Sequence, residues 1–201
     1  MSAGRFGIAE IGDGSRIRPT IRSHAPHRRA ASTRDSDMAD RAQQLFTYTI
    51  DDPDAGRQRV HASFLPQDVV FARGLPPAAI IGQVMGDARE LDPARFTVNR
   101  AFVDFLHACI AKHAARCPAL VSEAARQGQG HVFLIDARTP DPAGEVPPHD
   151  ILGAVAVEGG IIEDYQPNPN HRILTVDGVV TLDPWMFDRL QAELRRLVES
   201  A

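Results

Sequence analysis

Two runs near residue 50 alternate between apolar and polar side chains, which is the pattern of β-strands with one buried face. They are LFTYTI, residues 45–50, and RQRVHASFL, residues 57–65. The residues between them, DDPDAG, are turn formers, so the pattern predicts a β-hairpin. The next stretch, 69–85, is interrupted by glycine and proline, and it fits either a short buried strand or a turn of helix.

Three later segments are predicted to be helices, and the first and third of them carry the three- and four-residue apolar spacing of amphipathic helices. The first is predicted over residues 98–116. A second helix is predicted to begin at Pro118, because proline suits the first turn of a helix, and to end near residue 126. The third is predicted over residues 184–199, where Asp183 can cap the helix N-terminus.

The chain between the second and third helices predicts further strands. Residues 132–135, VFLI, form an uninterrupted apolar run, which is typical of a strand covered on both faces, so we place this strand centrally in the sheet. Two strand pairs then flank glycine-containing turns, 151–157 with 161–165 and 172–176 with 179–182. Such turns favour hairpins, because glycine tolerates positive φ.

Together these elements predict an α+β fold. We expect a mostly antiparallel sheet of five to seven strands, with two or three helices, those at 98–126 and 184–199, packed on one face. The other face of the sheet then needs cover, either from residues 69–85 or from a partner.

Residues 1–41 differ in composition from the rest of the chain. They have eight arginines, five acidic residues and few apolar positions, which predicts a disordered basic tail with a net charge of +3. Residues 42–201, predicted to be a single α+β domain, carry 14 basic and 21 acidic residues, a net charge of −7. An equally supported alternative is that Met38 is the true start and residues 1–37 are an upstream extension.

Composition narrows the class of protein. The sequence contains no run of about 18 apolar residues and no secretory signal pattern, which predicts a cytoplasmic protein without a membrane span. Its two cysteines, Cys109 and Cys117, lack the spacing of a zinc site and are expected to be reduced core thiols. The acidic body argues against nucleic-acid binding by the folded domain and leaves it open for the tail.

Asp136 and Arg138 are the first candidate site residues, because they directly follow the predicted central strand. A rigid strand can aim such a carboxylate into a crevice, where it could hold a metal or a proton while the arginine binds an anionic group. The alternative is structural. Asp136 and Arg138 then form an ion pair, or Asp136 caps the loop by accepting backbone N–H bonds.

A second cluster of polar residues spans nine positions at the end of a predicted strand. Its members are Glu163, Asp164, Tyr165, Asn168, Asn170 and His171. Loops with several polar groups on a strand scaffold are common binding sites. The same residues are also ordinary turn formers, and His171 could simply hydrogen-bond a carbonyl to fix the loop.

These residues allow two functional hypotheses. The leading one is a cytosolic accessory protein that uses no cofactor and recognises another protein through its acidic folded body and polar loops, with homodimerisation as a further possibility. The alternative is a small hydrolase or phosphoryl-handling enzyme that uses a divalent metal ion. Its proposed ligands are Asp136, Asp150, Glu163 and His171.

Overall fold

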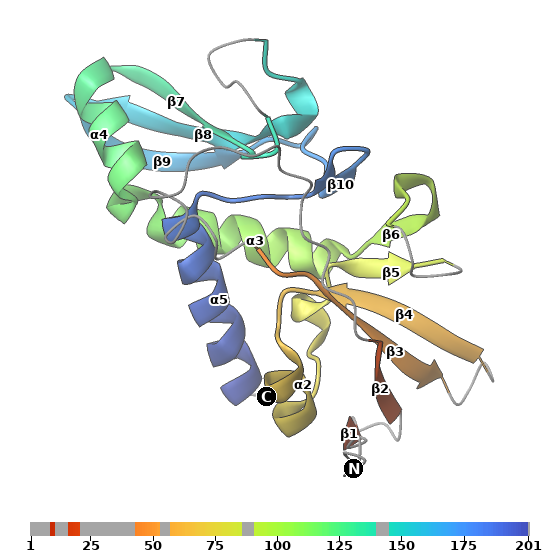
Figure 1. Ribbon diagram of the computed structural model, residues 1–201. Helices are drawn as coiled ribbons and strands as arrows, with labels where there is room; N and C mark the ends of the chain where they lie inside the picture. Colours follow the sequence, from red (N-terminus) through yellow and green to blue (C-terminus); the bar gives the residue numbers. More distant parts are fainter. Residues whose placement is uncertain are drawn as a thin grey trace, which may run out of the picture. The chain divides into compact units, whose positions relative to one another are not determined.

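The structure is a computed structural model that describes residues 9–10, 16–20, 43–52, 57–85, 91–139 and 145–200. The chain divides into two compact units (Figure 1). The first unit lies within residues 1–102 and 193–201, and the second comprises residues 103–192. The α+β class and the antiparallel pairing of the strands, both expected from the sequence, are confirmed, and the strands are distributed over three sheets.

The first unit is built on one antiparallel sheet in which neighbouring strands follow chain order. Its strands are β1 (Ala9–Glu10), β2 (Arg16–Thr20), β3 (Phe46–Asp52), β4 (Arg57–Ser63), β5 (Gly82–Val84) and β6 (Phe96–Val98). The predicted hairpin is β3 and β4, whose register pairs Phe46 with Ser63 and Asp52 with Arg57. Of residues 1–41, the predicted tail, the structure describes only strands β1 and β2. The rest of the tail prediction lies outside the described residues.

Residues 69–85 form both of the elements that their sequence allowed. Helix α2 (Gln67–Arg73) ends at Gly74, whose φ of 88° suits glycine, and a 3-10 turn η1 (Pro77–Ala79) precedes strand β5. The core of this unit contains fully buried aromatic side chains, with the Phe64 and Phe102 rings 6.0 Å apart between centroids. A 3-10 turn η2 (Pro93–Arg95) leads into β6.

The second unit contains a three-stranded antiparallel sheet and a small hairpin. The sheet has the order β7 (Gly130–Ile135), β8 (Ile151–Glu158), β9 (Ile161–Pro167), and the hairpin pairs β10 (Leu174–Thr175) with β11 (Gly178–Val179). A 3-10 turn η4 (Pro148–Asp150) leads directly into β8. Both glycine-containing turns predicted from the sequence therefore join paired strands.

Helices occupy the positions that apolar spacing predicted. They are α3 (Arg100–His113), continued by the 3-10 turn η3 (Ala114–Arg116), then α4 (Pro118–Gln127) and α5 (Pro184–Glu199). Asp183 caps α5, because its Oδ1 accepts hydrogen bonds from the backbone N–H groups of Trp185 at 3.0 Å and Met186 at 3.3 Å. Cys109 and Cys117 are both buried thiols that form no disulfide bond, as expected.

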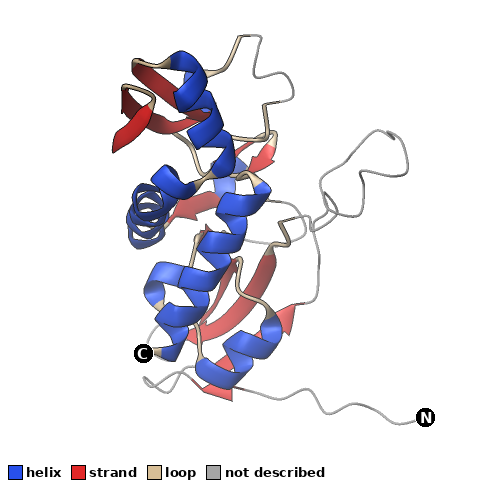
Figure 2. Cartoon of the chain, turned by 90° about the vertical axis from the view of Figure 1, so that its left-hand side faces the viewer, coloured by secondary structure: helices blue, strands red, loops and turns tan. Residues whose placement is uncertain are grey.

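Helix α4 covers one face of the second unit's sheet, and Figure 2 shows it lying across the strands. Val132, Leu134 and Val155 are buried on this inner face. Phe133 lies between the two buried β7 residues and is 59% exposed, because successive side chains of a strand point to opposite faces. Among the described residues, no helix is long and apolar enough to cross a membrane.

The predicted central position of residues 132–135 is wrong. Strand β7 is an edge strand, and β8 takes the centre of the sheet. The apolar run suggested cover on both faces, but only Val132 and Leu134 are buried. Because the residue on the open face is a phenylalanine, the apolar pattern of a half-buried strand resembled that of a fully buried one.

Candidate functional site

Asp136 is completely buried at the end of β7, and its carboxylate organises the loop that follows. Its Oδ1 atom accepts hydrogen bonds from the backbone N–H of Arg138 at 3.1 Å and of Thr181 at 2.9 Å. Its Oδ2 atom lies 2.8 Å from Nη2 of Arg138 and 3.3 Å from Nε2 of His171. Both structural interactions that the sequence allowed, the ion pair and the backbone cap, are therefore present.

Arg138 connects this carboxylate to three other parts of the unit. Its Nη1 atom donates to Thr175 Oγ1 at 3.1 Å and to the Gly178 carbonyl at 2.7 Å, both in the β10–β11 hairpin. Its Nη2 atom donates to the Arg172 carbonyl at 2.8 Å and lies 3.2 Å from Asp150 Oδ1. The side chain is only 3% exposed, so this is a buried charge held by several acceptors.

Asp150 and His171 complete the buried network. The Asp150 carboxylate is supported by the Thr139 hydroxyl, which donates to its Oδ2 atom at 3.1 Å. The His171 side chain is 1% exposed and pairs with Asp136 as described above. The network therefore holds two carboxylates, one guanidinium and one imidazole from residues that are up to 35 positions apart.

The groups of this network pair with one another and are shielded from solvent. A carboxylate that orients an imidazole is also the arrangement that prepares histidine for proton transfer. Here, however, a reacting molecule would have to reach a histidine side chain that is 1% exposed and an aspartate that is completely buried. The groups instead bind one another and fix the ends of β7, η4 and the β10–β11 hairpin.

The four residues of the metal alternative do not converge on a common point suited to an ion. Glu163 is exposed on β9, whereas Asp136 and Asp150 are buried. The cation between these two carboxylates is the Arg138 guanidinium. Within the part of the chain that the structure describes, no group of three or more His, Cys, Asp or Glu side chains is placed to hold a metal ion.

The second cluster is split between the two faces of the sheet. Glu163 and Asp164 are exposed, and Tyr165 is buried. The Tyr165 hydroxyl donates to the Leu152 carbonyl at 3.0 Å and lies 2.9 Å from Nδ1 of His107 on α3. Burial raises the pKa of Tyr165 well above its usual range, which suits a neutral hydrogen-bonding phenol.

Gly153 makes room for that tyrosine. A Cβ atom at this position would lie 2.6 Å from Cε2 and 2.7 Å from the hydroxyl of Tyr165, and closer still to the Gln166 carbonyl. These distances are shorter than any ordinary van der Waals contact. Glycine is therefore required here by the close approach of the tyrosine ring.

Asn168 fixes the loop between β9 and β10. Its Nδ2 group donates to the carbonyls of Pro148 at 2.8 Å and Ile151 at 2.7 Å, and its Oδ1 atom accepts from the backbone N–H of Asn170 at 3.0 Å. One amide side chain thus joins the loop to the η4 turn. Its role is to position the loop, as turn-forming asparagines commonly do.

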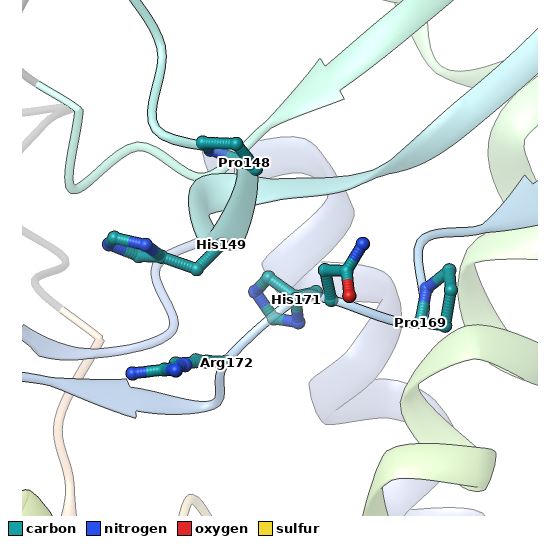
Figure 3. A pocket seen from close by; sticks show the side chains of 6 residues that line it. Pro148, His149, Pro169, His171 and Arg172 are labelled. Carbon is teal, nitrogen blue, oxygen red and sulfur yellow. The ribbon is translucent and has the colours of Figure 1, made fainter.

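A shallow pocket of about 420 Å³ lies where this loop meets η4 (Figure 3). It is lined by Pro148, His149, Pro169, Asn170, His171 and Arg172. The structure therefore brings the predicted residues Asn170 and His171 to the same concave surface, while Glu163 and Asp164 do not line it.

Sequence reasoning missed His149 and Arg172 in this pocket, as well as Thr175 and Thr181 in the buried network. His149 and Arg172 are the immediate neighbours of Asp150 and His171, and that adjacency is the only sequence signal that could have found them. The pairing of the two segments is tertiary, since the Arg172 N–H donates to the His149 carbonyl at 3.0 Å.

Comparison with known proteins adds no family to this description. No family model matches the chain, and no significant match is found among curated proteins or among solved structures.

Proposed function

We propose that this chain is a cytosolic interaction protein that binds a basic partner protein, using the open face of the β7–β9 sheet together with the polar loops beside it. The observation that carries the proposal is the exposure of Phe133 in the middle of an acidic unit. We call the surface formed by the outward-facing side chains of these strands the outer sheet face. Its residues are His131, Phe133, Ala154, Ala156, Glu158, Ile161, Glu163, Asp164 and Gln166.

Strand register places small apolar residues next to Phe133 on this face. Phe133 pairs with Ala154, which pairs in turn with Gln166, so the three side chains form one row across the sheet. His131 pairs with Ala156 in the neighbouring row. The small alanines leave the phenylalanine ring prominent, and a large exposed aromatic side chain is a common anchor in protein interfaces.

Charge supports a basic partner. Residues 103–192 contain twelve acidic and six basic residues, so most of the chain's negative charge outside residues 1–41 lies in this unit. Glu158 and Glu163 are exposed beside the apolar centre. Acidic groups around an apolar centre attract a partner rich in arginine or lysine, and the Phe133 ring can in addition bind a cation over its face.

The buried network supports recognition by preformed loops. Arg138 and Asn168 hold the segments 148–150 and 168–172 through backbone carbonyls, so these loops do not have to become ordered when a partner binds. Binding by preordered loops avoids an entropic cost.

The test is quantitative affinity capture from the native host with four versions of the full chain. We expect a basic protein to be enriched on the wild type, to be lost with Phe133→Ser and with Glu163→Lys, and to be released as salt increases. Val121→Ser is the matched control, because Val121 is an exposed apolar residue on α4, 43% accessible, outside the outer sheet face.

Three outcomes would refute the proposal. The first is the absence of any protein whose capture depends on Phe133. The second is equal loss with Val121→Ser, which would indicate nonspecific apolar adsorption. The third is self-association of the purified chain that Phe133→Ser abolishes in sedimentation, because this would assign the face to a second copy.

A further inference from the structure

The pocket between η4 and the β9–β10 loop differs in charge from the unit around it. None of its six lining residues is acidic, although acidic residues outnumber basic ones two to one in residues 103–192. Arg172 and His149 instead place a guanidinium and an imidazole in the lining. This local reversal of charge points to an anionic ligand.

His149 and Arg172 are held side by side by the backbone. The Arg172 N–H donates to the His149 carbonyl at 3.0 Å, and Figure 3 shows the two side chains projecting in the same direction from adjacent segments. The His149 side chain is 38% exposed, with its Nε2 atom 3.9 Å from Asp150 Oδ1, and Arg172 is also exposed. Both groups can therefore donate hydrogen bonds to one ligand that arrives from solvent.

Hydrogen bonds from side chains hold the backbone that carries His149 and Arg172. The Arg172 carbonyl accepts a hydrogen bond from the buried Arg138 guanidinium, and the Asn168 side chain joins the loop to Pro148 and Ile151. Donors on a fixed backbone lose little freedom when a ligand binds.

We propose that this pocket binds the phosphate group of a small phosphate monoester. Arg172 and His149 can supply donors to the terminal oxygens of such a group, and a guanidinium fork matches phosphate geometry. The Pro148 and Pro169 rings form apolar walls for the organic part of the ligand. A volume of about 420 Å³ is within the usual range for small-molecule sites. The pocket lies outside the outer sheet face but shares the segments 148–150 and 168–172 with the loops proposed to bind a partner, so the test below uses a small ligand and no partner protein.

The test is isothermal titration of the full chain with phenyl phosphate, inorganic phosphate and benzoate. Phenyl phosphate is expected to bind most tightly, because it combines the phosphate group with a ring for the proline walls. Inorganic phosphate should bind more weakly, and benzoate, which offers two oxygens in place of three, should also bind more weakly. Arg172→Gln is expected to weaken phenyl phosphate binding about tenfold or more, and His149→Gln by a smaller factor.

Arg116→Gln is the matched control, because it removes the same charge from an exposed position on η3 in the same unit. It should leave the affinity unchanged, and all variants should keep the wild-type melting temperature. The proposal is overturned if phenyl phosphate fails to bind at about 10 mM. It is also overturned if benzoate binds equally well, or if Arg172→Gln and Arg116→Gln weaken binding to the same extent.

Discussion

Replacing Arg138 with methionine should strongly destabilise the second unit. Methionine retains much of the length of the arginine stem but removes the guanidinium, whose Nη2 atom lies 2.8 Å from Asp136 Oδ2 and 3.2 Å from Asp150 Oδ1. Because these two carboxylates are 0% and 4% exposed, water cannot replace the lost cation without opening the structure. The carbonyls of Arg172 and Gly178 lose their donor as well.

The magnitude follows from the burial of these groups. Breaking a buried ion pair by removing one partner costs about 3–5 kcal/mol, because an uncompensated charge is left behind. This is a large share of the roughly 5–15 kcal/mol that stabilises a typical domain. Arg138→Lys should lie between the wild type and Arg138→Met, since lysine keeps the charge but lacks the fork that serves several acceptors at once.

Urea denaturation followed by circular dichroism measures these differences. The exposed arginine Arg126, which pairs with Glu123 on the surface of α4, provides the control Arg126→Met, and no measurable change is expected there. Adding Asp150→Asn to Arg138→Met should recover part of the loss, because it removes one of the uncompensated charges. If Arg138→Met costs less than about 1 kcal/mol, or if Asp150→Asn brings no recovery, the network does not stabilise the unit in this way.

Three further predictions concern other buried groups. Gly153→Ala should lower stability by about 1–3 kcal/mol in urea denaturation, because the added methyl overlaps Tyr165, and a neutral result would contradict the tight fit. Burial raises the pKa of both tyrosines, Tyr48 and Tyr165, above the usual value of 10.0, so absorbance at about 295 nm should show no tyrosinate in the folded protein at about pH 11. Burial and the nearby Arg59 lower the pKa of His61 from its usual value of 6.5. Below that pH the unfolded state therefore binds more protons than the folded state, and the free energy of unfolding should decrease as the pH is lowered. His61→Gln should flatten this decline, and an unchanged pH profile would contradict the assignment.

Local sequence signals predicted the helices well, because each signal acts through its own neighbours. Apolar spacing placed α5, and the Asp183 side chain caps it through N–H groups only two and three residues away. Gly128 similarly ends α4 through its own positive φ of 79°. Such features need no knowledge of the rest of the fold.

The position of a strand within a sheet could not be predicted in the same way. Phe133 belongs to an apolar run, yet it is exposed, because its side chain lies on the face of the sheet opposite to the buried Val132 and Leu134. Whether a second strand or a helix lies against an apolar residue depends on distant segments, which periodicity does not report.

The candidate site was predicted only in part, because some of its contacts join residues that are close in the sequence and others join distant segments. Asp136 stood out because it follows a buried strand, and its ion pair with Arg138 involves residues two positions apart. The partners Thr181 and Gly178 lie 45 and 40 residues from the groups that they bind, and no short motif links them. Sequence therefore indicated the centre of the network and left out its outer partners.

The division of the chain has a consequence for folding during synthesis. The second unit, residues 103–192, is contiguous and leaves the ribosome before residues 193–201, which belong to the first unit. The first unit can therefore be completed only after residues 193–201 have been made, whereas the contiguous unit needs no residue beyond 192. Contacts between residues 1–102 and 193–201 span the whole intervening unit, and contacts so far apart in the sequence form slowly during folding.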